Sequence, residues 1–194
     1  MNGRPPTVHK GRGAASNPEG RFERLERAQE DEDPSQRCAQ HMNLVSKDAS
    51  SIISRNDSPD IPFSQSINPN QGCEHGCVYC YARPSHSYLG LSPGLDCETR
   101  LFAKASAAEL LQQELGKTGL YRCEVISLGA NTDPYQPADR ELRITRAILE
   151  VLHEHRHPVG IVTKSSLIAR DTDLLEAAAS AGASSAGYVI LRLP

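Results

Sequence analysis

Three cysteines, Cys73, Cys77 and Cys80, lie within eight residues of the chain. Their spacings of four and three residues, with bends made possible by Gly72 and Gly76, can bring three thiolates to one metal centre. Thiolate ligands select zinc, Cu(I) or iron–sulfur clusters. With three cysteines instead of four, one iron of a cubane cluster keeps an open position for a substrate or cofactor. The spacing therefore indicates a metal centre that is suited to catalysis.

A zinc knuckle, completed by His75 or Cys97, is the alternative for the same cysteines. The cysteines outside the motif, Cys38, Cys97 and Cys123, are expected to be buried or inert thiols. The first residues of the chain carry no hydrophobic leader, so we expect the protein in the cytoplasm. Because that compartment is reducing, disulfides are not expected.

The composition is that of one ordinary domain: 194 residues, of which 38% are hydrophobic and 23% charged. Lys and Arg number 21 against 24 Asp and Glu, a net charge of −3 that supplies no basic field. Nucleic acid is therefore a possible partner that charge does not support. No apolar run approaches the length of about 18 residues that a membrane span needs, so no membrane partner is expected.

The chain changes character near residue 60. Residues 1–60 are rich in Pro, Gly, Asn, Asp and Glu, which predicts a polar, mostly disordered N-terminal tail with one short helix near Phe22–Gln29. An arm that packs over the domain or touches a partner is the alternative. Residues 61–194 are expected to form the core domain.

Strands alternate with helices in the core domain. A first strand leads into the cysteine motif, and short apolar runs predict three more, at Val125–Gly129, Val159–Thr163 and Gly187–Leu193. Helices are expected after three capping residues: Ser106, Asp139 and Asp171. This alternation predicts an α/β fold with about four parallel strands.

The cysteine motif carries a family resemblance. CxxxCxxC with an aromatic residue, Tyr79, before the last cysteine resembles the signature of radical SAM enzymes. The longer stretch INPNQGCEHGCVYCYARPSHSYLGLSPGLD, with LGANTDPYQP and IVTKS further on, is similar to the branch related to spore photoproduct lyase. The resemblance covers about residues 61–194 and implies a partial (βα)6 barrel.

The resemblance also implies a reaction. Cys73, Cys77 and Cys80 would hold a [4Fe–4S] cluster whose open iron chelates S-adenosylmethionine. An external reductant such as flavodoxin or ferredoxin would supply the electron that cleaves S-adenosylmethionine to methionine and a 5′-deoxyadenosyl radical. That radical would abstract a hydrogen from an unknown substrate. Tyr79 would pack beside the purine, and Tyr81 would relay a radical or serve only in packing.

Polar residues after two later strands are the candidates for binding S-adenosylmethionine. The resemblance implies that Thr132 and Asp133 face its amino group, and that Lys164 and Ser165 contact its carboxylate or ribose. Polar groups at the carboxyl ends of parallel strands are also what α/β architecture predicts. A simple turn at Asp133 and a solvated loop lysine at Lys164 are the structural alternatives.

The chain departs from the family in two respects. About two βα units of the barrel are absent, and segments that lie apart in relatives are joined near Leu174–Glu176, so residues 61–194 are interpreted as a truncated radical SAM core. Asn70 and Gln71 replace an aromatic and a basic residue. Two rival functions stay open: a DNA photolesion lyase and a non-catalytic metal-binding remnant.

Overall fold

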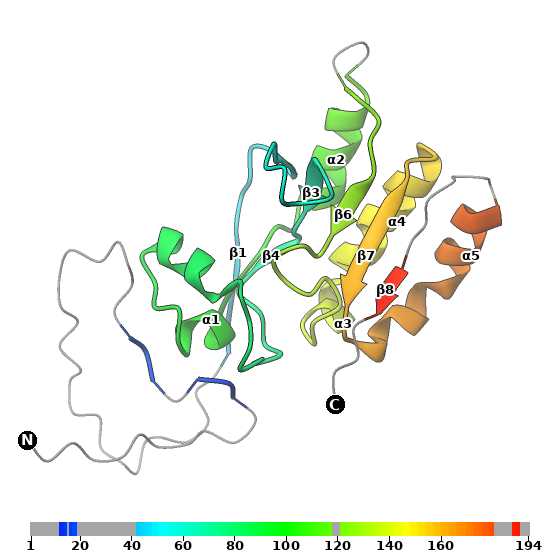
Figure 1. The fold of residues 1–194 in the computed structure, drawn as a ribbon. Helices are drawn as coiled ribbons and strands as arrows, with labels where there is room; N and C mark the ends of the chain where they lie inside the picture. The colour runs from blue at the N-terminus through cyan, green and yellow to red at the C-terminus, as the bar shows by residue number, and fades with distance from the viewer. Residues whose placement is uncertain (1–11, 15, 19–41, 118–120, 181–187, 191–194) are drawn as a thin grey trace, which may run out of the picture. The chain divides into compact units, whose positions relative to one another are not determined.

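The computed structural model describes residues 12–14, 16–18, 42–117, 121–180 and 188–190 (Figure 1). The chain divides into two compact units. The first unit contains residues 1–45 and 71–102, and the second contains residues 46–70 and 103–194. The fold is α/β, as the sequence predicts.

A five-stranded sheet forms the centre of the second unit. Its order is β2-β3-β6-β7-β8. The strands are β2 (Ile53–Arg55), β3 (Gln65–Ile67), β6 (Ile126–Leu128), β7 (Val159–Thr163) and β8 (Tyr188–Ile190). β2 runs antiparallel to β3, whereas β3, β6, β7 and β8 are parallel, which confirms the four predicted parallel strands. Among the described strands β2 and β8 stay at the two edges, so this sheet is open.

Three helices pack beside this sheet and bury its apolar residues. They are α2 (Ala107–Leu115), α4 (Ile144–Glu154) and α5 (Thr172–Ser180), and Figure 1 shows them side by side in that order. Ile144, Ile148 and Leu152 place one apolar stripe of α4 in the core, because residues four apart share a helix face. β6 contributes Ile126 and Leu128, both fully buried.

The helix predicted after Asp139 is two helices. α3 (Asp139–Leu142) and α4 are separated at Arg143, whose φ of 53° lies in the left-handed region and breaks the helical hydrogen bonding. Asp139 is not the N-cap residue of either helix, but its buried carboxylate accepts from the backbone N–H of Thr145 in the first turn of α4 at 3.0 Å. α2 lies where predicted, although the side chain of Ser106 makes no capping bond.

The predicted boundary at residue 61 differs from the structure. Ile52 and Ile53 are buried in the core of the second unit, and β2 begins there because its backbone pairs with β3. The core therefore begins before the predicted end of the tail. The helix predicted near Phe22–Gln29 lies outside the described residues.

The first unit is built on short elements. A sheet of order β1-β5-β4 consists of β1 (Asn43–Ser46), β5 (Arg100–Ala103) and β4 (Asn70–Gln71). One residue of each strand, Ser46, Ala103 and Asn70, is assigned to the second unit and the rest to the first. The 3-10 helix η2 (Arg83–Leu89) and α1 (Asp96–Thr99) follow the cysteine motif. Leu91, Leu95 and Leu101 are buried apolar residues of this unit.

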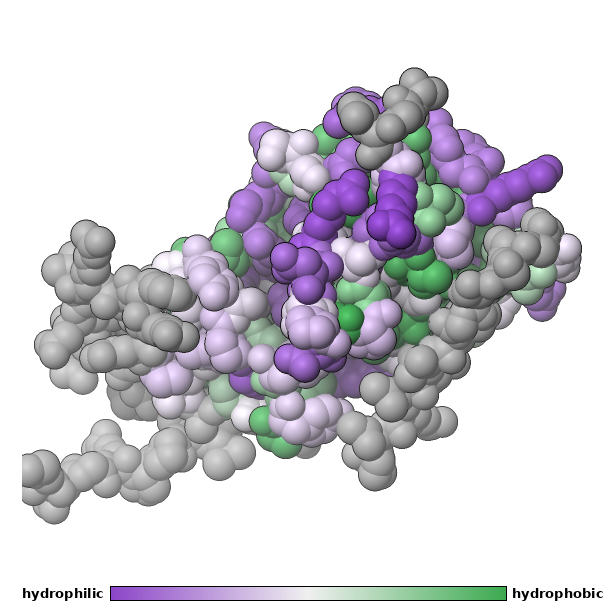
Figure 2. Space-filling view, turned by 45° about the horizontal axis from the view of Figure 1, so that its top comes forward, coloured by the Kyte–Doolittle hydropathy of each residue, from purple (hydrophilic) through white to green (hydrophobic). Residues whose placement is uncertain are grey.

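The surface mixes polar and apolar residues. Figure 2 shows hydrophilic residues spread among hydrophobic ones over the coloured part of the face in view. No helix within the described ranges has both the length and the apolar character needed to cross a membrane.

Candidate functional site

The three motif cysteines lie on one loop of the first unit, residues 72–80, which we call the cysteine loop. Two glycines with positive φ shape it, Gly72 at 81° and Gly76 at 58°. A Cβ atom on Gly72 would lie 2.8 Å from Leu101 Cδ2 and 2.9 Å from the carbonyl oxygen of Arg100. Both the backbone angle and the space therefore require glycine at position 72.

Backbone contacts attach the cysteine loop to the rest of the first unit. The N–H of Cys73 donates to the carbonyl oxygen of Cys97 at 2.8 Å, and Arg83 Nη2 donates to that of Cys77 at 2.9 Å. Cys73, Cys77 and Cys80 are thiols of intermediate exposure that form no disulfide. The loop thus presents three thiols that are neither sealed in the core nor fully solvated.

Cys97 is a buried neighbour of this loop. Burial, with a further contribution from Cys80, raises the pKa of the Cys97 thiol to about 11, so this thiol keeps its proton at neutral pH. The prediction of a buried thiol is confirmed for Cys97. Cys123, by contrast, is exposed, and Cys38 lies outside the described residues.

The aromatic residues of the motif face solvent. Tyr79 exposes 59% of its surface and Tyr81 exposes 78%. Tyr81 is therefore not packed into the core, contrary to the packing alternative for this side chain. The other large exposed apolar side chains nearby are Val78 and Tyr88.

In the second unit, polar side chains connect the carboxyl ends of β3 and β6. Asn68 Oδ1 accepts from the backbone N–H groups of Asn131 at 2.8 Å and of Thr132 at 3.3 Å. Thr132 Oγ1 donates to the carbonyl oxygen of Asn70 at 3.0 Å. Thr132 is only 5% exposed, so its hydroxyl bonds to the protein backbone and is shielded from solvent.

Asp133 connects β6 to β7 in the same way. Its Oδ1 accepts from Thr163 Oγ1 at 2.6 Å and from the N–H of Tyr135 at 2.9 Å, and its Oδ2 accepts from the N–H of Lys164 at 3.0 Å. The bond to Tyr135 makes an Asx turn, so the predicted turn is present. The same carboxylate also bridges two strand ends, which a simple turn would not do. We call Asn68, Asn70, Asn131, Thr132, Asp133, Thr163 and Lys164 the strand-end cluster.

Ser165 begins the next element. Its side chain accepts from the N–H of Leu167 at 3.2 Å and caps the 3-10 helix η3 (Ser166–Asp171). Ser165 also lines a hollow of about 310 Å³ whose wall includes Arg140 and Arg170. Lys164, its neighbour, is partly buried and is not the fully solvated loop lysine of the structural alternative.

Four members of the strand-end cluster were not among the predicted site residues: Asn131, Thr163 and the pair Asn68 and Asn70. The side chain of Asn70 is 2% exposed, and both its Nδ2 and Oδ1 atoms are buried without a hydrogen-bond partner in the described structure. Buried amides of this kind are rare, because each unpaired group costs free energy. The signal that could have found Asn68 and Asn70 is the pair of asparagines in INPN, directly after a strand.

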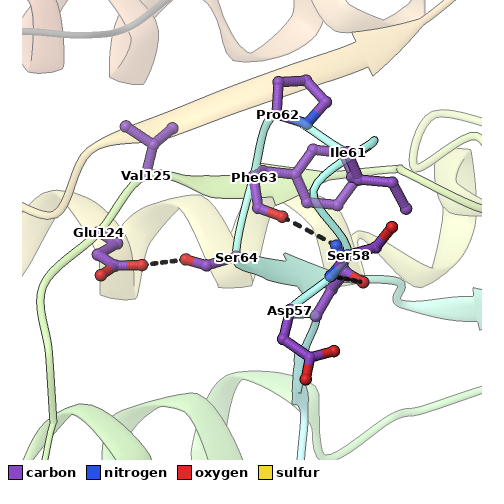
Figure 3. Close-up of a pocket in the computed structure, with 9 residues that line it drawn as sticks. Asp57, Ser58, Ile61, Pro62, Phe63, Ser64, Glu124 and Val125 are labelled. Atoms are coloured by element: carbon purple, nitrogen blue, oxygen red, sulfur yellow. Dashed lines mark hydrogen bonds between the residues drawn. The ribbon is translucent and has the colours of Figure 1, made fainter.

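A larger pocket lies at the opposite end of the parallel strands. It has a volume of about 520 Å³ and is lined by residues that precede β3 and β6, including Phe63, Ser64, Glu124 and Val125. Figure 3 shows Ser64 and Glu124 pointing toward one another, with the hydroxyl donating to the carboxylate. Because this pocket contains no predicted site residue, we do not assign the function to it.

Comparisons with known proteins identify relatives that match part of the chain. Uncharacterized proteins of Mycobacterium tuberculosis and Mycobacterium bovis are 40% identical to it over 119 residues, which cover 61% of this chain and 35% of theirs. An uncharacterized protein of Methanocaldococcus jannaschii is 29% identical over 110 residues, covering 57% of this chain and 39% of its own.

The chain therefore spans little more than a third of the length of the curated relatives that it matches. No protein-family model matches the chain, and no solved structure does.

Proposed function

We propose that this chain is a radical SAM protein of the branch related to spore photoproduct lyase, with an incomplete (βα)6 barrel as its fold. In this proposal it binds a [4Fe–4S] cluster and S-adenosylmethionine and cleaves the latter reductively, with an external reductant such as flavodoxin or ferredoxin. The observation that carries it is one loop with three cysteines that form no disulfide, together with a polar cluster at the carboxyl ends of three parallel strands of the second unit.

The chemistry of the donor set supports the cluster. Cys73, Cys77 and Cys80 offer three soft sulfur ligands, and Cys97 is biased toward the protonated thiol by its burial. In the described residues no three His, Cys, Asp or Glu side chains are gathered closely enough to hold a metal ion. Cluster binding would therefore need the loop to draw its three sulfurs together.

Orphaned polar atoms support a polar ligand in the second unit. Among the described residues the amide of Asn70 has a donor and an acceptor without partners, and it belongs to the same cluster as Thr132 and Lys164. The amino and carboxylate groups of S-adenosylmethionine are ligands of the matching kind. Ser165 follows directly and lines a hollow.

The residues of this chain would divide the work. The cluster, when bound, supplies the electron for reductive cleavage. Cys73, Cys77 and Cys80 would hold the cluster and leave one iron open. Lys164 would attract a carboxylate. Asp133 would act as a positioning residue, because both its oxygens are already engaged by protein donors.

Anaerobic reconstitution with iron and sulfide, followed by assay for 5′-deoxyadenosine from S-adenosylmethionine, tests the proposal. A brown protein that releases the nucleoside is the expected result. A colourless protein that holds zinc would favour the zinc knuckle. A cluster-loaded protein that releases no nucleoside would favour the metal-binding remnant, and activity on irradiated DNA would favour a photolesion lyase.

A further inference from the structure

We propose that an N-terminal segment, residues 12–14 and 16–18, is an intramolecular clamp on the cysteine loop. We call it the N-terminal strap. What the loop binds rests on the function proposed above, but the clamp is a property of the first unit alone. It makes Gly13, Glu98 and Arg83 positioning residues, which act on the loop backbone and not on any ligand.

Glu98 of α1 is the attachment point of the strap. Its carboxylate is almost fully buried, and it accepts from the N–H of Gly13 at 3.2 Å and of Ala14 at 3.1 Å. The strap also donates from Arg12 Nη1 to the carbonyl oxygen of Glu98 at 3.0 Å. A buried carboxylate needs such donors, because an unsatisfied charge inside a protein is costly. The strap therefore completes the hydrogen bonding of Glu98.

Arg83 carries this connection to the cysteine loop. Its Nη2 atom lies 2.5 Å from Glu98 Oε1 and 2.9 Å from the carbonyl oxygen of Cys77. Its Nη1 atom donates to the carbonyl oxygen of Gly94 at 3.1 Å. The guanidinium fork can make these bonds at once, which the single ammonium of lysine cannot reproduce. Strap, Glu98, Arg83 and the backbone of Cys77 thus form one continuous chain of bonds.

Gly13 also presses directly on the loop. A Cβ atom on this residue would lie 2.3 Å from the carbonyl oxygen of Gly76 and 2.9 Å from the carbonyl carbon of Cys77. These neighbours are backbone atoms, which cannot swing away as a flexible side chain would. Any larger residue at position 13 must therefore displace either the strap or the cysteine loop.

A second anchor holds the other end of the strap on α1. Asn17 Nδ2 donates to Asp96 Oδ1 at 3.0 Å, and the N–H of Asp96 donates back to Asn17 Oδ1 at 2.8 Å. The N–H of Leu95 donates to the carbonyl oxygen of Ser16 at 3.2 Å. Two anchors on the same short helix leave the Gly13 end seated against the loop.

The test measures how readily the loop thiols react in the full-length protein without metal. Iodoacetamide labelling, read by peptide mass spectrometry, compares Cys77 with the exposed Cys123, which serves as an internal reference. Gly13→Ala is expected to raise the Cys77 labelling rate relative to Cys123 by about 10-fold, the effect of losing roughly one hydrogen bond. Arg83→Lys is expected to act in the same direction, because it keeps the charge beside Glu98 but loses the fork.

Gly90→Ala is the matched control. Gly90 also has a positive φ, 67°, and belongs to the same unit, but a Cβ atom there meets nothing within 4 Å. The Gly90→Ala substitution should strain the backbone of the first unit without raising the rate at which iodoacetamide labels Cys77. An unchanged rate in a folded Gly13→Ala protein overturns the proposal, and so does an equal rise in Gly90→Ala. Failure of the unmodified protein to retain iron would refute the cluster and leave this comparison intact.

Discussion

Asp133 and Thr163 join the carboxyl ends of two neighbouring strands through a bond of 2.6 Å from Thr163 Oγ1 to Asp133 Oδ1. Thr163 is 2% exposed, so the bond is made out of contact with water. The second carboxylate oxygen accepts from the N–H of Lys164. One side chain therefore fixes the two loops that carry most of the predicted site residues of the second unit.

Replacing Asp133 with Asn should destabilise the protein. The amide can keep its oxygen toward Thr163, but its NH₂ group would then face the N–H of Lys164. Because both of these groups are donors, the bond from Lys164 is lost. We expect a loss of about 1–3 kcal/mol in the free energy of unfolding, measured by urea denaturation. The matched control is Asp173→Asn, at an ion pair with Arg146 whose carboxylate is exposed, which should cost less because solvent screens such pairs. Equal costs would contradict the bridging role.

Iron retention should separate the motif cysteines from the others. Alanine at Cys73, Cys77 or Cys80 should abolish iron binding after anaerobic reconstitution, whereas Cys97→Ala and Cys123→Ala should retain it. The physical reason is that the three loop thiols are accessible while burial keeps Cys97 protonated. Iron content and absorbance provide the measurement. Loss of metal in Cys97→Ala would instead indicate a fourth sulfur ligand.

Thr132→Val should weaken the binding of S-adenosylmethionine without changing iron content. It removes the hydroxyl that donates to the carbonyl oxygen of Asn70, at a cost of about 1 kcal/mol in stability. Calorimetric titration of the reconstituted protein measures the affinity.

Thr145→Val is the control for this substitution. It removes a buried hydroxyl that donates to the carbonyl oxygen of Pro134, in the same unit but outside the strand-end cluster. Affinity should stay unchanged in this variant. A fall in both affinity and iron content in Thr132→Val would mean general unfolding and would count against a local role.

The stability of the second unit should fall in acid because of His157. Burial lowers the pKa of this imidazole below its ordinary value, although its bond to the Pro158 carbonyl opposes the shift. The unfolded chain therefore takes up the proton first as the pH drops. The contribution of His157 to the free energy of unfolding is fully present above about pH 6.5 and is lost as the pH falls below that value.

Urea denaturation midpoints measured between about pH 8 and about pH 5 show whether stability falls with pH as expected. His157→Gln should flatten the fall in stability, although it also removes the contact between His157 Nε2 and the hydroxyl of Tyr121. His155→Gln, at an exposed histidine whose charge adds only a smaller part to the lowering of the His157 pKa, should flatten the fall less than His157→Gln does. An identical slope in all three proteins would rule His157 out as the source.

Local sequence patterns were sufficient to predict the parallel strands and most of the helices. The apolar run at Val159–Thr163 coincides with β7, and α2 begins and ends as its spacing predicts. The break at Arg143 was not predictable, because nothing in the residues Asp139–Leu152 disfavours one continuous helix. The Asp139 carboxylate accepts from Arg170 Nη2 and from the N–H of Thr145, and these bonds hold the chain in the broken conformation.

The sequence by itself determined the kinds of chemical groups: three thiols at fixed spacing, polar residues after buried strands, and glycines at the bends. It could do so because side-chain chemistry and short-range periodicity are local properties. Only the tertiary structure decided which groups are engaged. The Asp133 carboxylate accepts hydrogen bonds from Thr163 and from the N–H of Lys164, and the Asn70 amide finds no partner among the described residues. Gly13 contacts the cysteine loop although more than sixty residues separate it from Gly76 in the sequence. Such partners are chosen by packing between distant segments, which no local pattern encodes.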